Sequence, residues 1–146
     1  MSQFLPPTIS LSGKVHALYF AADWCPDCRD FQPTLNAFYD KVNEKEHVFD
    51  IIFVSSDETE QDQEQHYREK QRPWQVIPFE SPLKNELKRK YGVCAGREQQ
   101  AVGVQERLGG IPSVVIVAAN GDLIDLHGVD KIESLGAAAI QEWLNK

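Results

Sequence analysis

The chain has 146 residues, of which 42% are hydrophobic and 25% are charged, so we expect one globular domain over residues 1–146 with an ordinary apolar core. Its formal net charge of −7 disfavours nucleic acid as a partner, because phosphates repel an acidic surface. The first residues lack the basic start and apolar run of a signal peptide, and no segment has the length of a membrane span. We therefore expect no membrane association and a cytoplasmic location, with the nucleus left open.

The chain contains three cysteines, an odd and small number. A small secreted protein that relies on a disulfide framework usually carries more of them, in an even count. Three cysteines fit better with a functional pair and one spare thiol in a reducing compartment. Nothing in the sequence favours a dimer, and we expect a monomer.

Four apolar runs predict strands, and they are residues 15–22, 49–55, 113–119 and 123–127. The last two are separated by Asn120-Gly121, a dipeptide typical of two-residue hairpin turns, so this pair should be antiparallel. Helical periodicity fills the other gaps. The alternation predicts an α/β fold with a mixed central sheet flanked by helices.

Apolar side chains recur at helical spacing in two segments, one after the first strand and one near the end of the chain. They are Phe31, Leu35, Phe38 and Val42 in the first segment and Ile132, Leu135, Ala139 and Trp143 in the second. Pro33 interrupts the first of these helices and is expected to kink it. The polar stretch 57–70 predicts an exposed helical connection.

One basic cluster lies in a further helical pattern. It comprises Lys84, Lys88, Arg89 and Lys90, which alternate with Leu83, Leu87 and Tyr91. We interpret this cluster as the solvated face of a helix rather than as a docking patch.

The most informative stretch is residues 24–28, with the sequence Trp-Cys-Pro-Asp-Cys, close behind the apolar run 17–22. Cysteines three residues apart at the start of a helix lie close enough to form a disulfide. Cys25 would lie among the unpaired N–H groups of the first turn, which stabilise a thiolate, and is therefore the expected nucleophile. Cys28 is expected to resolve the mixed disulfide. Pro26 suits the first turn because its missing N–H would have no partner there.

Two other interpretations of the cysteine pair are a buried structural pair and half of a metal site. Zinc held by thiolates usually needs four ligands, but only Cys94 remains and the histidines follow no ligand spacing. The histidines are His16, His47, His66 and His127. We therefore favour redox chemistry and expect no metal. Cys94 is either an ordinary buried residue or a regulatory thiol.

Four separated features now coincide: the Trp-Cys-x-x-Cys motif after a strand, a proline eight residues beyond Cys25, Gly110-Ile111-Pro112 before an apolar strand, and a terminal hairpin with a helix. Together they resemble the thioredoxin fold. The flanking residues are similar to the nucleoredoxin and tryparedoxin branch of that fold. These flanking matches are residues 20–39, residues 53–58, Pro73-Trp74, Pro78-Phe79 and residues 130–143.

The resemblance implies roles for individual residues. Cys25 becomes the attacking thiolate and Cys28 the resolving thiol. The residues implied to contact an extended substrate segment are Trp24, Pro26, Ile111 and Pro112. The resemblance also implies that a cis peptide bond precedes Pro112. Independently, a proline directly before a buried strand must lie in a turn, since it cannot donate into a central ladder.

The sequence departs from this family six residues before Cys25 and at charged residues next to the cysteines. Most thioredoxins carry a buried Asp where this chain has Tyr19, as tryparedoxins do, so the proton acceptor for Cys28 is unassigned. Asp27 disfavours negative charge on Cys25, whereas Arg29 and the helix dipole favour it. The sequence does not settle whether these groups together favour or disfavour the thiolate form of Cys25.

Two further departures concern the substrate. Ser56 stands where tryparedoxins place a Trp, which argues against a trypanothione-like partner. The largest departure is an insertion at approximately residues 94–108, directly before the Gly110-Ile111-Pro112 loop. The insertion either shapes substrate choice or is a tolerated surface excursion.

We therefore expect a thiol–disulfide oxidoreductase that reduces disulfides in protein substrates through Cys25 and Cys28. It requires no bound cofactor, only an external thiol or an NADPH-linked reductase as electron donor, and the sequence does not identify the upstream reductant. The alternative from another class is a redox-gated protein-binding module in signalling, with little turnover. A weaker alternative is a peroxidase, whose reactive cysteine normally lies outside a Cys-x-x-Cys pair.

Overall fold

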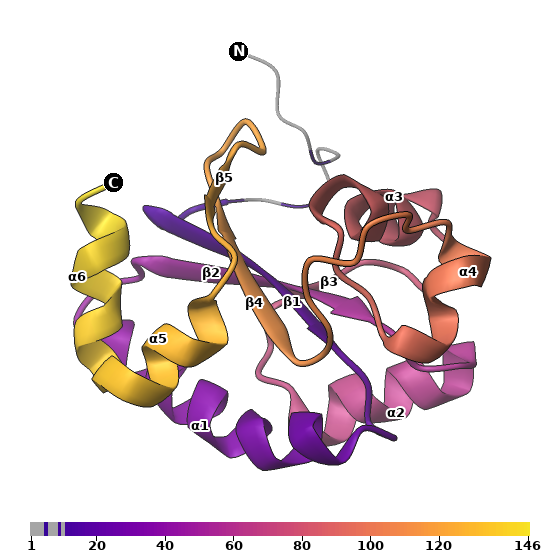
Figure 1. Cartoon of the computed structure of the whole chain (residues 1–146). Helices are drawn as coiled ribbons and strands as arrows, with labels where there is room; N and C mark the ends of the chain where they lie inside the picture. The colour runs from indigo at the N-terminus through magenta and orange to yellow at the C-terminus, as the bar shows by residue number, and fades with distance from the viewer. Residues whose placement is uncertain (1–4, 6–8, 10) are drawn as a thin grey trace.

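The computed structural model describes Leu5, Ile9 and residues 11–146. Its centre is a five-stranded sheet in the order β3-β2-β1-β4-β5 (Figure 1). The strands are β1 (Val15–Ala21), β2 (Phe49–Ser55), β3 (Gln75–Val76), β4 (Ser113–Val117) and β5 (Leu123–Asp125). β1, β2 and β3 are parallel, whereas β4 and β5 pair antiparallel to their neighbours, so the sheet is mixed as expected.

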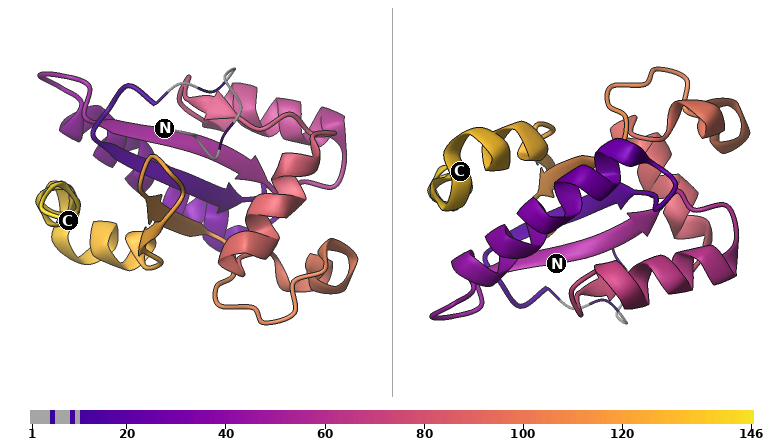
Figure 2. Two further views of the ribbon diagram at one scale, coloured as in Figure 1. Left: turned by 90° about the horizontal axis from the view of Figure 1, so that it is seen from above. Right: turned by 90° about the horizontal axis from the view of Figure 1, so that it is seen from below.

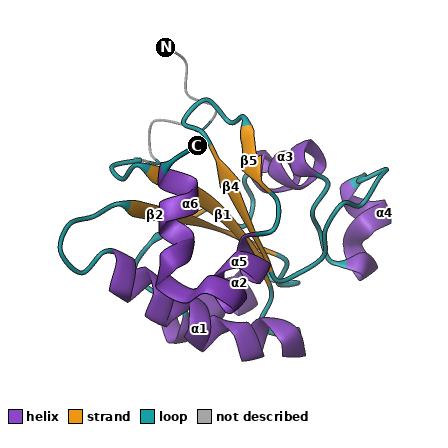
Figure 3. Ribbon diagram, turned by 60° about the vertical axis from the view of Figure 1, so that its left-hand side comes forward, coloured by secondary structure: helices purple, strands orange, loops and turns teal. Residues whose placement is uncertain are grey.

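Helices cover both faces of this sheet (Figures 1 and 3). The helical elements are α1 (Pro26–Val42), α2 (Glu60–Lys70), α3 (Pro82–Tyr91), η1 (Gly96–Glu98), α4 (Gln99–Val102), α5 (Gly128–Leu135), η2 (Gly136–Ala138) and α6 (Ala139–Leu144). α1 continues through Pro33, which lies inside it. Within the described part of the chain, none of these helices is long and apolar enough to cross a membrane.

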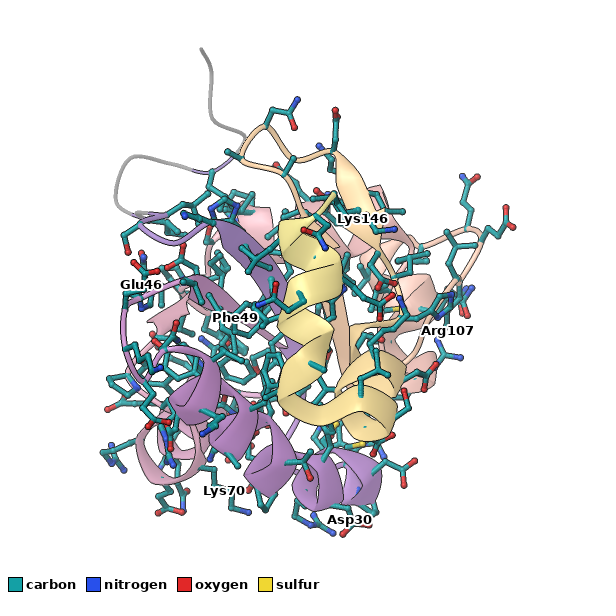
Figure 4. All side chains as sticks on the ribbon, turned by 90° about the vertical axis from the view of Figure 1, so that its left-hand side faces the viewer. Asp30, Glu46, Phe49, Lys70, Arg107 and Lys146 are labelled. Atoms are coloured by element: carbon teal, nitrogen blue, oxygen red, sulfur yellow. The ribbon has the colours of Figure 1, made fainter. Side chains whose placement is uncertain are left out.

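The central strand β1 is buried along its whole length and supplies both halves of the core. Because side chains alternate along a strand, Ala17 and Tyr19 face α1, α5 and α6, whereas Leu18 and Phe20 face α3. Figure 4 shows the contrast between core and surface, with Phe49 inside the molecule and exposed side chains such as Asp30 and Glu46 directed outward. The positions of the three long strands are confirmed.

The predicted terminal hairpin is antiparallel, but its turn differs from the expectation. The N–H of Ala118 donates to the carbonyl of Asp122, so the loop comprises residues 119–121 rather than two residues. Gly121 takes the left-handed conformation at φ 96°, which closes this longer turn. The two-residue strand β3 was not predicted, because so short a run carries no periodicity.

The predicted helical spacing of apolar side chains near the end of the chain is wrong at Leu135, a residue that is 44% exposed. The helix ends there, because Gly136 adopts φ 59° and ψ −143° and separates α5 from α6. Ile132, Ala139 and Trp143 are buried in the core as expected.

The interpretation of the basic cluster as a solvated face is wrong for two of its members. Arg89 and Lys90 are exposed, but Lys84 is only 8% exposed and Lys88 only 1%. The reason is the segment 94–108, which folds beside α3 and brings Glu98 within 2.8 Å of the Lys88 ammonium. Both views of Figure 2 show this segment at one side of the sheet, next to α3.

Candidate active site

The cysteine motif lies where the chain leaves β1 and enters α1. Cys25 is the N-cap residue of α1, and its backbone N–H donates to the carbonyl of Ala22. Its Sγ accepts a hydrogen bond from the backbone N–H of Cys28 at 3.3 Å. A sulfur in this position receives an N–H that has no partner within the helix, which favours negative charge on it.

Cys28 lies one turn further along α1 and is only 1% exposed, compared with 7% for Cys25. Both thiols are free, so the structure shows the reduced pair. Burial, and secondly the hydrogen bond with Cys25, raise the pKa of the Cys28 thiol. Cys28 is therefore held as a thiol at neutral pH, in the state expected before a resolving step.

The loop before β4 lies against this pair. The Ile111–Pro112 peptide bond is cis, as the resemblance implied. The thiol of Cys25 lies 3.9 Å from the carbonyl oxygen of Ile111 and donates to it. Ile111 and Pro112 are partly buried, and Pro26 is exposed at the first position of α1. The cysteines and the loop thus form one site from sequence segments that lie far apart.

Trp24 stands between this site and the segment 94–108. Its indole Nε1 donates to the carbonyl of Ser56 at 3.0 Å, which fixes the ring beside the end of β2. The guanidinium of Arg97 lies 3.7 Å from the centre of the Trp24 ring, and the same group pairs with Glu58 at 3.0 Å. Sequence reasoning missed Arg97, because its contact with Trp24 depends on how a distant loop folds back.

A buried carboxylate supports the residues before Cys25. Asp57 accepts the backbone N–H of Asp23 at 2.8 Å, the hydroxyl of Ser55 at 2.6 Å and Nδ1 of His66 at 2.9 Å. Burial alone would raise the pKa of Asp57, but the hydrogen bonds from His66 and Ser55 outweigh it and hold that pKa below its ordinary value. The carboxylate therefore remains ionised and fixes the loop that precedes the cysteines.

The hydrogen-bond network also determines the proton on His66. Trp74 Nε1 donates to Oε1 of Gln71, which fixes the orientation of that amide. The Gln71 NH₂ group therefore donates to Nε2 of His66 at 3.1 Å. His66 must then carry its proton on Nδ1, where it donates to Asp57.

The same network reaches the residue beneath the cysteines. Gln71 and Tyr19 both donate to Oε1 of Gln32, at 2.7 Å and 2.9 Å. Burial, together with the nearby Cys28 and Cys25, raises the pKa of Tyr19. Tyr19 therefore stays a neutral hydroxyl and does not supply an anionic base where most thioredoxins have an Asp.

The remaining thiol, Cys94, lies in a small apolar cluster with Val102 and Val104. It is fully buried, and burial raises its pKa. In the described residues, no group of three or more His, Cys, Asp or Glu side chains is arranged to hold a metal ion.

We predict that brief alkylation of the reduced native protein at neutral pH labels one thiol, that of Cys25. Cys28 and Cys94 are more deeply buried and have raised pKa values, so both react slowly. Intact mass after the reaction, with peptide mapping, measures the result. Unfolded protein, in which all three cysteines react, is the control, and rapid native labelling of Cys94 would contradict the prediction.

Comparison with known proteins identifies relatives over most of the chain. The profile of the Thioredoxin-like family matches residues 13–123. Human nucleoredoxin-like protein 1 is 30% identical over 138 residues, which cover 91% of this chain and 58% of that protein. Probable nucleoredoxin 1 of Arabidopsis thaliana is 31% identical over 129 residues, 88% of this chain and 19% of that protein. The chain thus spans less than two thirds of the length of these curated relatives.

Solved structures of related proteins superimpose on most of this chain. Thioredoxin from Wuchereria bancrofti superimposes with a TM-score of 0.68 at 32% identity, covering 91% of this chain and 81% of that chain. Tryparedoxin from Trypanosoma brucei also has a TM-score of 0.68, at 28% identity, covering 97% of this chain and 90% of that chain.

Proposed function

The chain belongs to the thioredoxin-like family, and we propose on this basis that it is a thiol–disulfide oxidoreductase that reduces disulfides in proteins. The observation that carries the proposal is the position of the Cys25 Sγ at the start of α1, where it accepts the N–H of Cys28. The Ile111 carbonyl beside Cys25 adds a backbone group that an extended substrate can contact. Its location is proposed to be cytoplasmic.

The proposed reaction has two displacement steps. The Cys25 thiolate attacks one sulfur of the substrate disulfide, so that a mixed disulfide forms and one substrate thiolate leaves and takes up a proton. The Cys28 thiol then loses its proton and attacks the Cys25 sulfur. The intramolecular disulfide forms, and the second substrate thiolate leaves and takes up the proton released by Cys28, which completes a two-electron reduction. An external dithiol or an NADPH-linked reductase restores the pair, without a bound cofactor.

The raised pKa of Cys28 supports reduction as the direction of the reaction. Stabilising a thiolate stabilises the reduced form of a cysteine pair and makes the pair more oxidising. Cys28 gains no such stabilisation, because it is buried as a neutral thiol. Cys28 therefore adds nothing that would make the pair more oxidising, which is consistent with the proposed reduction of substrates.

The substrate is proposed to lie across the residues that surround Cys25. The residues proposed to contact the substrate are Trp24, Pro26, Ile111 and Pro112. Disulfide-containing proteins are the proposed partners, and the chain is proposed to act as a monomer. A second candidate function is a redox-gated binding module. It is favoured by the Arg97 contact with Trp24, which connects the segment 94–108 to the redox site.

Reduction of insulin disulfides with dithiothreitol as the electron donor tests the proposal. We expect turnover by the wild type and none above background for Cys25→Ser, because serine cannot form the mixed disulfide. Cys94→Ala, which alters a thiol outside the site, is the control and should retain activity. Inactivity of the correctly folded wild type would contradict a general reductase and favour the binding module.

A further inference from the structure

A cavity lies between α3 and the segment 94–108, on the side of Trp24 where Arg97 stacks. Its volume is about 640 Å³. Two of its lining residues connect it to Trp24: Arg97 stacks on the Trp24 ring, and Ser56 accepts the indole N–H through its carbonyl. A ligand in this cavity would therefore lie against two residues that contact Trp24, the residue before Cys25.

Most charged groups that line the cavity already have partners. Lys88 pairs with Glu98 at 2.8 Å, and Arg97 pairs with Glu58 at 3.0 Å. Asp57 is held by the three donors described above. These groups satisfy one another and leave little capacity for a ligand.

Lys84 is the exception. More than nine tenths of this residue is buried, and its ammonium lies 3.7 Å from the centre of the Phe79 ring. Its backbone N–H donates to the carbonyl of Ser81, but among the described residues its ammonium forms neither a hydrogen bond nor an ion pair. Lys84 lines the cavity. Burial, and secondly the nearby Lys88, lower its pKa to about 8, although Glu98 attracts it at longer range.

The Lys84 ammonium lines the cavity with its three N–H donors unpaired by protein groups, so an oxygen acceptor that enters the cavity can accept from it. A carboxylate does so best, because a charge-assisted hydrogen bond is stronger than a neutral one. Phe79 and Val102 supply apolar walls for the carbon atoms that carry the carboxylate. The net charge of −7 disfavours broadly acidic partners, so selection would depend on one local contact.

We propose that this cavity is a subsite for a carboxylate carried by the disulfide substrate, with Lys84 as its charged anchor. The inference rests on the proposed reductase function and narrows its substrate class. The carboxylate is either an acidic side chain of a protein or part of a small disulfide. It binds on the far side of Trp24 from the cysteines, through Lys84, and takes no part in the chemistry.

The first test measures binding without turnover. Glutarate is titrated into the reduced wild-type protein while the side-chain NMR signals of the lysines are followed. We expect a saturable shift of the Lys84 signal and no comparable shift of Lys45, an exposed lysine after α1. Equal responses of both lysines, or none from Lys84, would overturn the subsite.

The second test measures selection during reduction. Two peptide disulfides are compared that differ only by Glu or Gln beside the cysteine, together with a small disulfide bearing carboxylates and its amide. In each pair, we expect Lys84→Met to lower kcat/KM for the carboxylate substrate about fivefold to tenfold. The kcat/KM for the matching amide substrate should stay unchanged. Lys84→Arg should restore part of the preference, and Lys45→Met should retain all of it.

The outcomes separate the two proposals. Equal acid-to-amide ratios in the wild type and Lys84→Met would overturn the subsite while reductase activity stands. If the wild type reduces none of these disulfides, the reductase proposal fails, and the glutarate titration alone decides whether Lys84 binds a carboxylate.

Discussion

On the proposed mechanism, Cys28→Ser is expected to abolish turnover and to leave the protein covalently trapped on its substrates. Cys25 can still attack a disulfide, but serine cannot displace the product, so the mixed disulfide accumulates. We expect turnover to fall on the order of 100-fold or more, because the two thiols act as one unit. Acid-quenched reactions on a non-reducing gel, followed by mass spectrometry of the adduct, measure both effects.

The control for the trap is the double variant Cys25→Ser with Cys28→Ser, which should form no adduct. The substitution at Cys28 is conservative in size, and the residue is buried beside the apolar core, so unfolding should be checked by circular dichroism. A folded Cys28→Ser protein that turns over at the wild-type rate would show that Cys28 does not resolve the intermediate. An adduct on Cys94 would show that the nucleophile is assigned wrongly.

The parts of the fold and site that could be predicted from sequence depend on local spacing. β1, β2 and β4 appear as apolar runs, and the positions of Cys25 and Cys28 at the start of α1 follow from the three-residue interval between them. The cis bond before Pro112 was predicted from the resemblance, since nothing local specifies it.

The parts that could not be predicted depend on contacts between distant segments. Lys84 and Lys88 look like solvated residues because the sequence of α3 does not show that the segment 94–108 will cover them. Arg97 likewise reaches Trp24 only after this segment folds back. Asp57 and His66 lie nine residues apart across the start of α2, and their pairing carries no motif.

Asp57→Ala is expected to lower the free energy of unfolding by about 3 kcal/mol, the largest stability effect that we predict near the site. The substitution leaves the buried hydroxyl of Ser55, Nδ1–H of His66 and the backbone N–H of Asp23 without their acceptor. Urea unfolding followed by circular dichroism measures the change. Asp40→Ala, which breaks the exposed pair with Arg72, is the matched control and should cost less than about 1 kcal/mol.

The pH dependence of stability distinguishes the role of Asp57 as an ionised hydrogen-bond acceptor from a role in packing alone. Its pKa is lower in the folded than in the unfolded protein, so its contribution is fully present above the ordinary carboxyl pKa of about 4 and is lost as the pH falls through the folded value. The difference in stability between wild type and Asp57→Ala should therefore be constant near neutral pH and shrink in acid. A difference that stays equal at low pH would mean that alanine acts by leaving a void. Because Asp57 also fixes the N–H of Asp23, two residues before Cys25, the variant should reduce disulfides more slowly even where it remains folded.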